Sequence, residues 1–162
     1  MYDDKVVCPF HGASFNLKDG SLENGPAIDP IPSFDVVEKK GEFYVKVPEH
    51  IPLKGKFKFA KRDQHNKTRY VIVGGGIGGM SCADTLRESG FTGEIVVISR
   101  EDRETYDKTL ITKMLPEADS HTFAMRTKHD IQDAHITWKG GKHVTSVNAK
   151  EKFVTLNDGS TL

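Results

Sequence analysis

The chain has 162 residues, of which 36% are hydrophobic and 28% charged, and its formal net charge is zero. A balanced charge argues against a nucleic-acid partner, and no apolar stretch approaches the length of a membrane span. The two cysteines, Cys8 and Cys82, lie in unlike contexts, which argues against a disulfide framework and favours a cytosolic or organellar location. A change of residue pattern along the chain indicates two small domains rather than one large one.

The first part, residues 1–47, has the pattern of short β-strands joined by turns. Strands are expected at residues 5–7 and 13–17. Residues 33–38 and 42–47 alternate apolar and polar side chains on either side of a turn that ends at Gly41, which indicates a hairpin. Residues 48–68 combine prolines, a glycine and many lysines and arginines, so they are predicted to be a basic linker between the two domains.

From residue 69 to residue 162 the pattern changes to alternating strand and helix. Residues 70–73 and 94–99 are expected to be buried parallel strands, separated by a glycine cluster and by a helix that Gly90 ends. Helices are then expected at residues 109–115, stopped by Pro116, and at residues 123–134, with His135 in a left-handed backbone position after the second. A strand at 136–138 and a hairpin at 142–147 and 152–156 complete the prediction.

The glycine cluster is spaced as Gly74-x-Gly76-x-x-Gly79, the βαβ fingerprint of dinucleotide binding. One glycine makes the turn, the next lets the backbone approach a pyrophosphate, and the third packs helix against strand. The pyrophosphate is expected at the free N–H groups of the helix start, which includes Ile77. Glu101, 22 residues after Gly79, is the candidate ribose ligand and Asp102 its rival. The alternative is that both are solvated loop carboxylates.

A second candidate site is the pair Cys8 and His11, three residues apart on a loop with proline and glycine. A thiolate and an imidazole at this spacing form half of a metal site, and both iron and zinc accept these ligands. An unliganded cysteine and histidine are equally compatible with the pair alone. The motif by itself therefore leaves iron, zinc and no metal open.

The residues from Cys8 to Gly20, followed by Gly25, Pro26 and Ala27, closely resemble the second half of a Rieske [2Fe–2S] domain. The resemblance implies a cluster held by one cysteine and one histidine from each of two loops, with Cys8 and His11 in the second loop. The first loop would lie upstream of Met1, so half of the ligands are expected to be present and the chain is not expected to hold the cluster alone. Three departures from the high-potential members, at Phe10, Ala13 and Phe15, predict a low reduction potential.

Residues 106–113, Tyr-Asp-Lys-Thr-Leu-Ile-Thr-Lys, resemble a segment of the FAD-dependent pyridine-nucleotide oxidoreductases, especially ferredoxin reductases and the apoptosis-inducing-factor group. The resemblance implies FAD as cofactor and NAD(P)H as co-substrate, with Lys108 and Lys113 beside the flavin and pyrophosphate. Thr105 and Thr109 stand where this family has prolines. With both parts in this order, the whole chain resembles the Rieske-containing, apoptosis-inducing-factor-like flavoproteins.

The sequence therefore predicts a small all-β Rieske-type half-domain at 1–47, a linker at 48–68, and an incomplete α/β Rossmann-like FAD-binding domain at 69–162. The expected function is an NAD(P)H-dependent oxidoreductase that passes electrons between FAD and a [2Fe–2S] cluster, here a fragment truncated at both ends and inactive alone. The alternatives are an inactive interaction or regulatory module related to apoptosis, and a zinc-binding β-domain joined to an NAD-binding domain. The expected location is the cytoplasm or, from the resemblance, the mitochondrion. The sequence indicates no catalytic residue, electron acceptor or oligomeric state.

Overall fold

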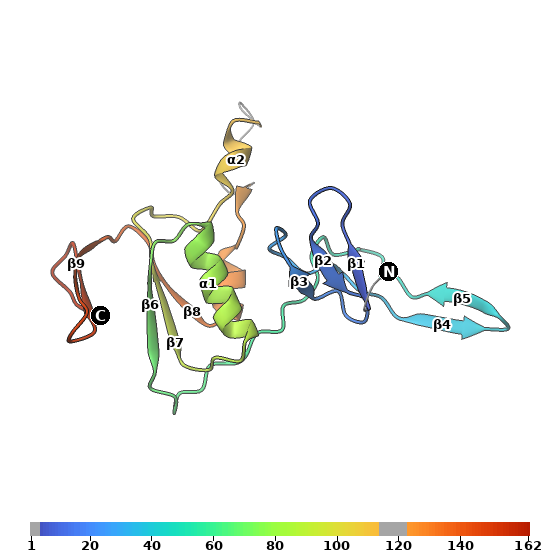
Figure 1. Cartoon of the computed structure of the whole chain (residues 1–162), viewed down its shortest axis with the longest axis horizontal. Coiled ribbons are helices and arrows are strands. Elements are labelled where there is room, and N and C mark those ends of the chain that lie inside the picture. The colour runs from blue at the N-terminus through green and yellow to red at the C-terminus, as the bar shows by residue number, and fades with distance from the viewer. Residues whose placement is uncertain (1–3, 114–122) are drawn as a thin grey trace. The chain divides into compact units, whose positions relative to one another are not determined.

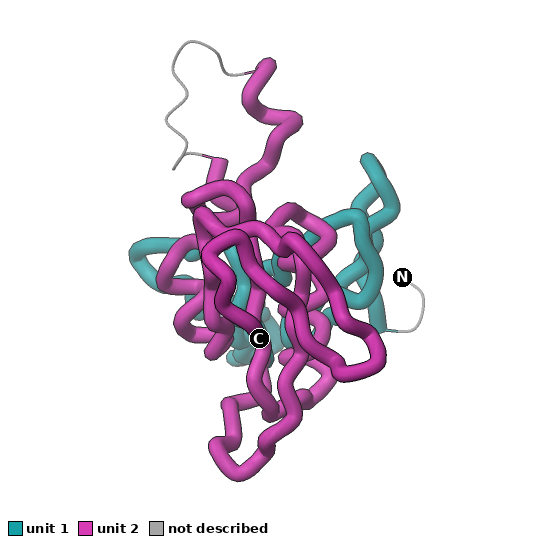
Figure 2. Tube along the Cα trace, turned by 90° about the vertical axis from the view of Figure 1, so that its left-hand side faces the viewer, with its two compact units in different colours: residues 1–58 teal, residues 59–162 magenta. Residues whose placement is uncertain are grey.

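A computed structural model describes residues 4–113 and 123–162. The chain divides into two compact units, Met1–Lys58 and Phe59–Leu162 (Figure 2), and the division falls inside the segment expected to be a linker. Within the described residues, none of the helices has the length and apolar character that crossing a bilayer requires.

The first unit contains two antiparallel β-structures (Figure 1). Strands β1 (Lys5–Val7), β2 (Ser14–Asn16) and β3 (Leu22–Asn24) form a three-stranded sheet in that order, and β4 (Val36–Lys39) pairs with β5 (Glu42–Val45). The strands expected at 5–7 and 13–17 and the later hairpin are confirmed. Strand β3 was not predicted from the sequence, because its three residues include only one apolar side chain and so show no alternation.

The second unit is built on a parallel sheet in the order β6-β7-β8 (Figure 1). The strands are β6 (Arg69–Val73), β7 (Glu94–Ile98) and β8 (Ile136–Lys139), and α1 (Ile77–Glu88) connects the first two. The central strand β7 is buried along four of its five residues, as its unbroken apolar run predicts. Because β6 and β7 are parallel, their carboxyl-terminal ends lie at the same edge of the sheet, where the glycine cluster begins.

Two apolar clusters cover the two faces of this sheet. One consists of side chains from α1, α3 (Lys128–Asp133) and the strands: Met80, Ala83, Ile95, Val97, Ile131, Ala134 and Ile136. The other places Val96 and Ile98 of β7 against Val154 and Leu156, which belong to the hairpin of β9 (Val144–Asn148) and β10 (Phe153–Leu156). The helices thus lie on one face and the predicted hairpin on the other.

The end of α1 is fixed by backbone bonds. Gly90 has a positive φ of 88°, and its N–H donates to Arg87 O at 3.1 Å while the N–H of Phe91 donates to Leu86 O at 2.9 Å. This pair of bonds is the Schellman arrangement, which requires the left-handed conformation that glycine adopts without strain. The predicted role of Gly90 as a helix cap is confirmed.

Arg87, near the end of α1, is fully buried, with 0% exposure. Its guanidinium donates to four backbone carbonyls, of Ala134 at 2.7 Å, Phe91 at 2.7 Å, Gly93 at 2.9 Å and His135 at 2.8 Å. Burial lowers the pKa of Arg87, although a guanidinium stays protonated in proteins. One side chain therefore joins the end of α1 to the start of β7 and to the turn between α3 and β8.

The prediction of a helix over residues 123–134 is wrong in its start. The helix α3 begins only at Lys128, because Thr127 and Asp130 form a capping box: the Thr127 N–H donates to Asp130 Oδ2 at 2.8 Å, and the Asp130 N–H donates to Thr127 Oγ1 at 3.2 Å. Before it, Ala124 forms an antiparallel bridge with Tyr106. His135 has a φ of 51°, as expected.

The helix expected at 109–115 is α2 (Lys108–Ile111), and residues 114–116 lie outside the described part of the chain. Asp107 is its N-cap and accepts from the Thr109 N–H at 2.8 Å. This cap starts the helix one residue before the predicted position, which makes Lys108 its first residue.

Candidate functional site

The geometry of the turn after β6 explains two of the three fingerprint glycines, Gly74 by its backbone conformation and Gly79 by a close contact. Gly74 has a φ of 111°, and its N–H donates to Ile98 O of the neighbouring strand at 2.8 Å. A Cβ placed on Gly79 would lie 1.9 Å from Gly74 O. The first glycine therefore makes a turn that a larger residue would strain, and the third lets α1 pack directly onto that turn.

Gly75, which the fingerprint leaves open, is equally constrained. A Cβ at this position would lie 2.4 Å from Cη2 of Trp138 and 2.6 Å from Cβ of Ser99. The Gly75 carbonyl accepts a hydrogen bond from Thr105 Oγ1 at 2.8 Å. The turn thus rests on a tryptophan ring and is tied to a segment 30 residues away, which the spacing of the glycines could not indicate.

The start of α1 is open toward an anion. Gly76 is its N-cap, with an extended backbone, no side-chain cap and no acidic residue in the first turn. A Cβ on Gly76 would have no neighbour within 4 Å. Because the first N–H groups of a helix have no intrahelical partner and lie at the positive end of its dipole, this end suits a phosphate group.

A pocket of about 210 Å³ lies at this helix start. Its lining combines the glycine turn with the segment after β7: Gly74, Gly75, Gly76, Ser99, Arg100, Glu101, Arg103, Glu104, Tyr106 and Lys108. Of the residues predicted for the nucleotide site, four therefore meet here. Ile77 and Gly79 lie behind the lining in α1, and Lys113 is an exposed residue after α2 that does not line the pocket.

The structure separates the two rival carboxylates. Glu101 lines the pocket, whereas Asp102 does not and instead lies against the next turn, where a Cβ on Gly140 would be 3.0 Å from Asp102 Oδ1. The backbone carbonyl of Glu101 also accepts from the Gly141 N–H at 3.3 Å. The geometry thus favours Glu101 for any ligand in this pocket.

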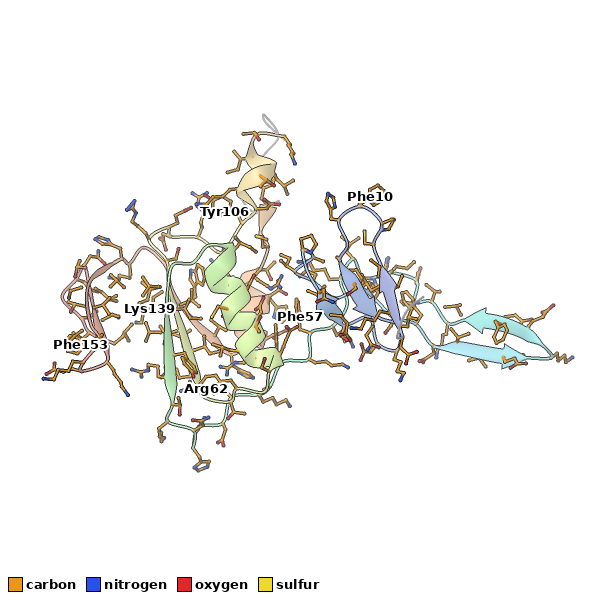
Figure 3. The ribbon with its side chains drawn as sticks, viewed as in Figure 1. Phe10, Phe57, Arg62, Tyr106, Lys139 and Phe153 are labelled. Carbon is orange, nitrogen blue, oxygen red and sulfur yellow. The ribbon has the colours of Figure 1, made fainter. Side chains whose placement is uncertain are left out.

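Glu101 is part of a small charged group. A hydrogen bond from Tyr106 and the ammonium of Lys108, 3.1 Å from Glu101 Oε1, lower the pKa of Glu101. The same contacts raise the pKa of Tyr106 and of Lys108. Lys108 Nζ and the Arg103 guanidinium also lie 5.6 and 5.8 Å from the centre of the Tyr106 ring, a residue that Figure 3 labels between α1 and α2.

Cys8 and His11 lie on the loop between β1 and β2. The loop is closed by bonds from the Cys8 N–H to Ala13 O at 2.7 Å and from the Gly12 N–H to Cys8 O at 3.0 Å. Cys8 is a half-buried free thiol, His11 is exposed, and Phe10 at the tip is 85% exposed (Figure 3). The loop therefore carries a cysteine thiol and a histidine imidazole three residues apart, in a turn closed by backbone hydrogen bonds.

Two donors do not complete a cluster that takes two cysteines and two histidines. In residues 4–113 and 123–162, no group of three or more histidine, cysteine, aspartate or glutamate side chains is placed to hold a metal ion. The residues present therefore fit one of the two ligand loops of such a cluster. Cys82, the other cysteine, is exposed on α1.

Comparison with known families separates the two parts of the chain in the same order. Residues 68–162, more than half of the chain, match the model of the pyridine nucleotide-disulphide oxidoreductases. The chain belongs to this family. Residues 1–35 match the model of the Rieske [2Fe–2S] domain.

Individual relatives agree with this assignment. Apoptosis-inducing factor 3 of Homo sapiens is 30% identical over 165 aligned positions, which cover 98% of this chain and 27% of that protein. The ferredoxin–NAD(+) reductase subunit of the benzene 1,2-dioxygenase system of Pseudomonas putida is 30% identical over 93 residues, 57% of this chain and 23% of its own. The chain spans about a quarter of the length of the curated relatives it matches.

Solved structures support the fold of the second unit. The covalent complex of putidaredoxin reductase and putidaredoxin matches 60% of this chain and 24% of its own, with 28% identity and a TM-score of 0.57. The NADH:rubredoxin oxidoreductase of Clostridium acetobutylicum, at 21% identity and a TM-score of 0.55, has the same fold. The family resemblance and the fold class predicted from the sequence are confirmed, whereas the individual site residues and domain limits stay predictions.

Proposed function

We propose that the pocket of the second unit binds the ADP part of FAD, and that the chain is part of an NAD(P)H-dependent flavoprotein that exchanges electrons with a Rieske-type [2Fe–2S] cluster. The observation that carries this proposal is the uncapped start of α1 at Gly76, which opens on a pocket that also holds Glu101 and Lys108. A helix dipole, a carboxylate and a cation in one pocket match the pyrophosphate and ribose of a dinucleotide.

Each part of the pocket has a separate task in this proposal. The N–H groups at the start of α1 bind the pyrophosphate, and Ile77 and Gly79 act through the backbone that they place there. The carboxylate of Glu101 accepts hydrogen bonds from ribose hydroxyl groups, and Lys108 offsets the charge of the phosphates. Lys113, outside the pocket lining, is proposed to meet the flavin end of the ligand. When bound, FAD supplies the conversion of a two-electron hydride into single electrons.

Cys8 and His11 are proposed to supply one thiolate and one imidazole to the cluster. The match of residues 1–35 to the Rieske model and the shared loop of the two side chains support this role. Relatives named as ferredoxin–NAD(+) reductases support an iron–sulfur protein or domain as the electron partner. The free state of Cys8 and Cys82 supports a reducing compartment, cytoplasmic or mitochondrial.

Calorimetric titration of the full chain tests the proposed ligand. ADP and FAD are expected to bind with one-to-one stoichiometry and to compete, because the pocket recognises the part that they share. Binding of FAD that excess ADP does not displace, or no binding of either nucleotide, would contradict the assignment of this pocket.

The variant Glu101→Gln, which removes the charge of this carboxylate, is expected to weaken ADP binding about tenfold. The reason is that a hydrogen bond to a charged group contributes about 1.5 kcal/mol or more. The matched control is Asp102→Asn, which removes the same charge one residue away and outside the pocket, and its dissociation constant should be unchanged. Equal effects of Glu101→Gln and Asp102→Asn would show that the carboxylates act only through the overall field.

The pH dependence of this affinity follows from the pKa of Glu101. Tyr106 and Lys108 lower that pKa, so the carboxylate stays ionised as the pH falls below neutrality. It becomes protonated only at a pH below the ordinary pKa of a glutamate side chain. The affinity of the wild type for FAD is therefore expected to be constant between about pH 8 and pH 5. FAD is the ligand for this measurement because, unlike ADP, it has no terminal phosphate that titrates near about pH 6. A loss of affinity centred near pH 6 would point to a histidine instead.

A further inference from the structure

A single buried hydroxyl links the glycine turn to the segment that carries Tyr106 and Lys108 into the pocket. We propose that Thr105 is the positioning residue of this site: its bond to Gly75 O holds the peptide between Gly75 and Gly76 so that the Gly76 N–H faces the phosphates of a bound nucleotide. This inference rests on the proposed function of the pocket and adds the residue that sets the orientation of its anion-binding backbone.

The donor of this hydrogen bond is a buried side chain, and the acceptor Gly75 is half-buried. Thr105 is 1% exposed, and its Oγ1 donates to Gly75 O at 2.8 Å. Its neighbours Glu104 and Tyr106 line the pocket, but Thr105 does not. The hydroxyl therefore approaches the turn from the protein interior, on the side away from the ligand space, and the Gly75 carbonyl is directed toward that interior.

The geometry of the peptide bond carries the effect across to Gly76. In a trans peptide, the carbonyl of one residue and the N–H of the next are held in one plane and point in opposite directions. With Gly75 O bound to Thr105, the Gly76 N–H is directed away from the interior and toward the open side of the turn. A rotation of this peptide by half a turn would instead place a carbonyl oxygen against the phosphates.

The turn needs such a restraint because its own residues provide little. Gly74 and Gly76 have no neighbour within 4 Å of a Cβ position, and glycine has the widest choice of backbone conformations. Packing on Trp138 limits how close the turn lies to the sheet, but a ring contact does not fix which way a carbonyl points. The directional bond from Thr105 does.

Thr105 is itself held in place by the backbone. Its carbonyl accepts from the Met125 N–H at 2.8 Å, and the Asp107 N–H donates to Phe123 O at 2.9 Å, so residues 105–107 lie in a short antiparallel pairing with residues 123–125. The same segment leads directly into α2, whose first residue is Lys108. The proline that the resemblance places at this position has no hydroxyl, so the bond to Gly75 is a feature of this chain.

The test compares three single variants of the full chain. Thr105→Val keeps the shape and removes the hydroxyl, and Thr105→Ser keeps the hydroxyl. Thr145→Val is the matched control, because Thr145 Oγ1 also donates to a backbone carbonyl, Thr155 O at 3.2 Å, in a hairpin that contributes no residue to the pocket. The readouts are the dissociation constant of ADP, measured calorimetrically, and the urea midpoint of the second unit.

Thr105→Val is expected to weaken ADP binding about tenfold, the effect of losing one hydrogen bond that orients the site. Thr105→Ser is expected to restore binding to within about twofold of the wild type, a difference of about 0.4 kcal/mol. Thr145→Val should leave the dissociation constant unchanged. A purely structural role predicts a different result, in which Thr105→Val lowers the urea midpoint while the folded fraction binds ADP as tightly as the wild type, and that result would overturn the proposal.

A measurement on the wild type keeps the inference testable if Thr105→Val does not fold. In ¹H–¹⁵N spectra, ADP is expected to shift the amide resonance of Gly76 more than that of Gly78, and an unshifted Gly76 amide in the bound state would overturn the proposal. Absence of any ADP binding by the wild type would instead refute the proposed function of the pocket, and the positioning role with it.

Discussion

Replacement of Arg87 by methionine is expected to lower the free energy of unfolding of the second unit by about 4 kcal/mol. Methionine retains much of the apolar stem, so the change removes mainly the guanidinium. Four carbonyls then lose their charged donor, at the start of β7 and at the turn between α3 and β8, and the buried ones are left without a hydrogen bond. The expected loss is a large part of the stability of a small domain.

Urea unfolding followed by the fluorescence of Trp138, the single tryptophan of the chain, measures this loss. The control is Arg69→Met, because Arg69 also forms a short ion pair, 2.6 Å from Glu94 Oε2, but its side chain is 46% exposed. Exposed ion pairs contribute about 1 kcal/mol or less. Equal effects of the two variants would show that the buried position of Arg87 is not what makes it stabilising.

Replacement of Gly79 by alanine is expected to abolish ADP binding and to lower the free energy of unfolding by about 3 kcal/mol. The added Cβ would lie 1.9 Å from Gly74 O, a distance that no pair of nonbonded atoms tolerates. Because Gly74 O belongs to the backbone and not to a flexible side chain, α1 must move away from β6, and its N–H groups then leave the pocket.

Gly78→Ala provides a control of opposite sign. Gly78 precedes Gly79 in the same helix, and a Cβ there would meet nothing within 4 Å. Since alanine favours helix over glycine, this variant is expected to stabilise the second unit by up to about 1 kcal/mol and to bind ADP as the wild type does. Thermal unfolding and an ADP titration on both variants check the pair, and a similar loss in both would mean that the helix start itself does not tolerate alanine.

The parts of the fold that the sequence predicted best are those with strong local signals. The strand β7 was visible as an unbroken apolar run, α1 as an amphipathic pattern between glycines, and the cap at Gly90 as a single residue. The start of α3 was predicted too early because Phe123 was counted as a helical residue. It is instead buried in a segment that pairs with residues 105–107, a contact between distant parts of the chain.

In the candidate site, too, features with a local sequence signal were predicted, whereas contacts between distant segments were not. The glycine spacing predicted the turn and the helix start, and the distance from Gly79 led to Glu101. Spacing could not distinguish Glu101 from Asp102, because both follow the same strand and the choice depends on which side chain meets the turn at Gly140. The bond between Thr105 and Gly75 and the cations around Tyr106 likewise depend on how separate segments pack.

The contact between Gly75 and the Trp138 ring implies that these two positions are linked in evolution. Any side chain at residue 75 would overlap the ring and Ser99, so residue 75 cannot become larger while both neighbours stay as they are. Proteins of this family in which residue 75 is larger are therefore expected to have a smaller residue in place of Trp138, together with a change at Ser99 that makes room for the new Cβ. A pairing of this kind would appear in aligned sequences as covariation between a nominally unconstrained position of the glycine motif and the end of a strand more than 60 residues away.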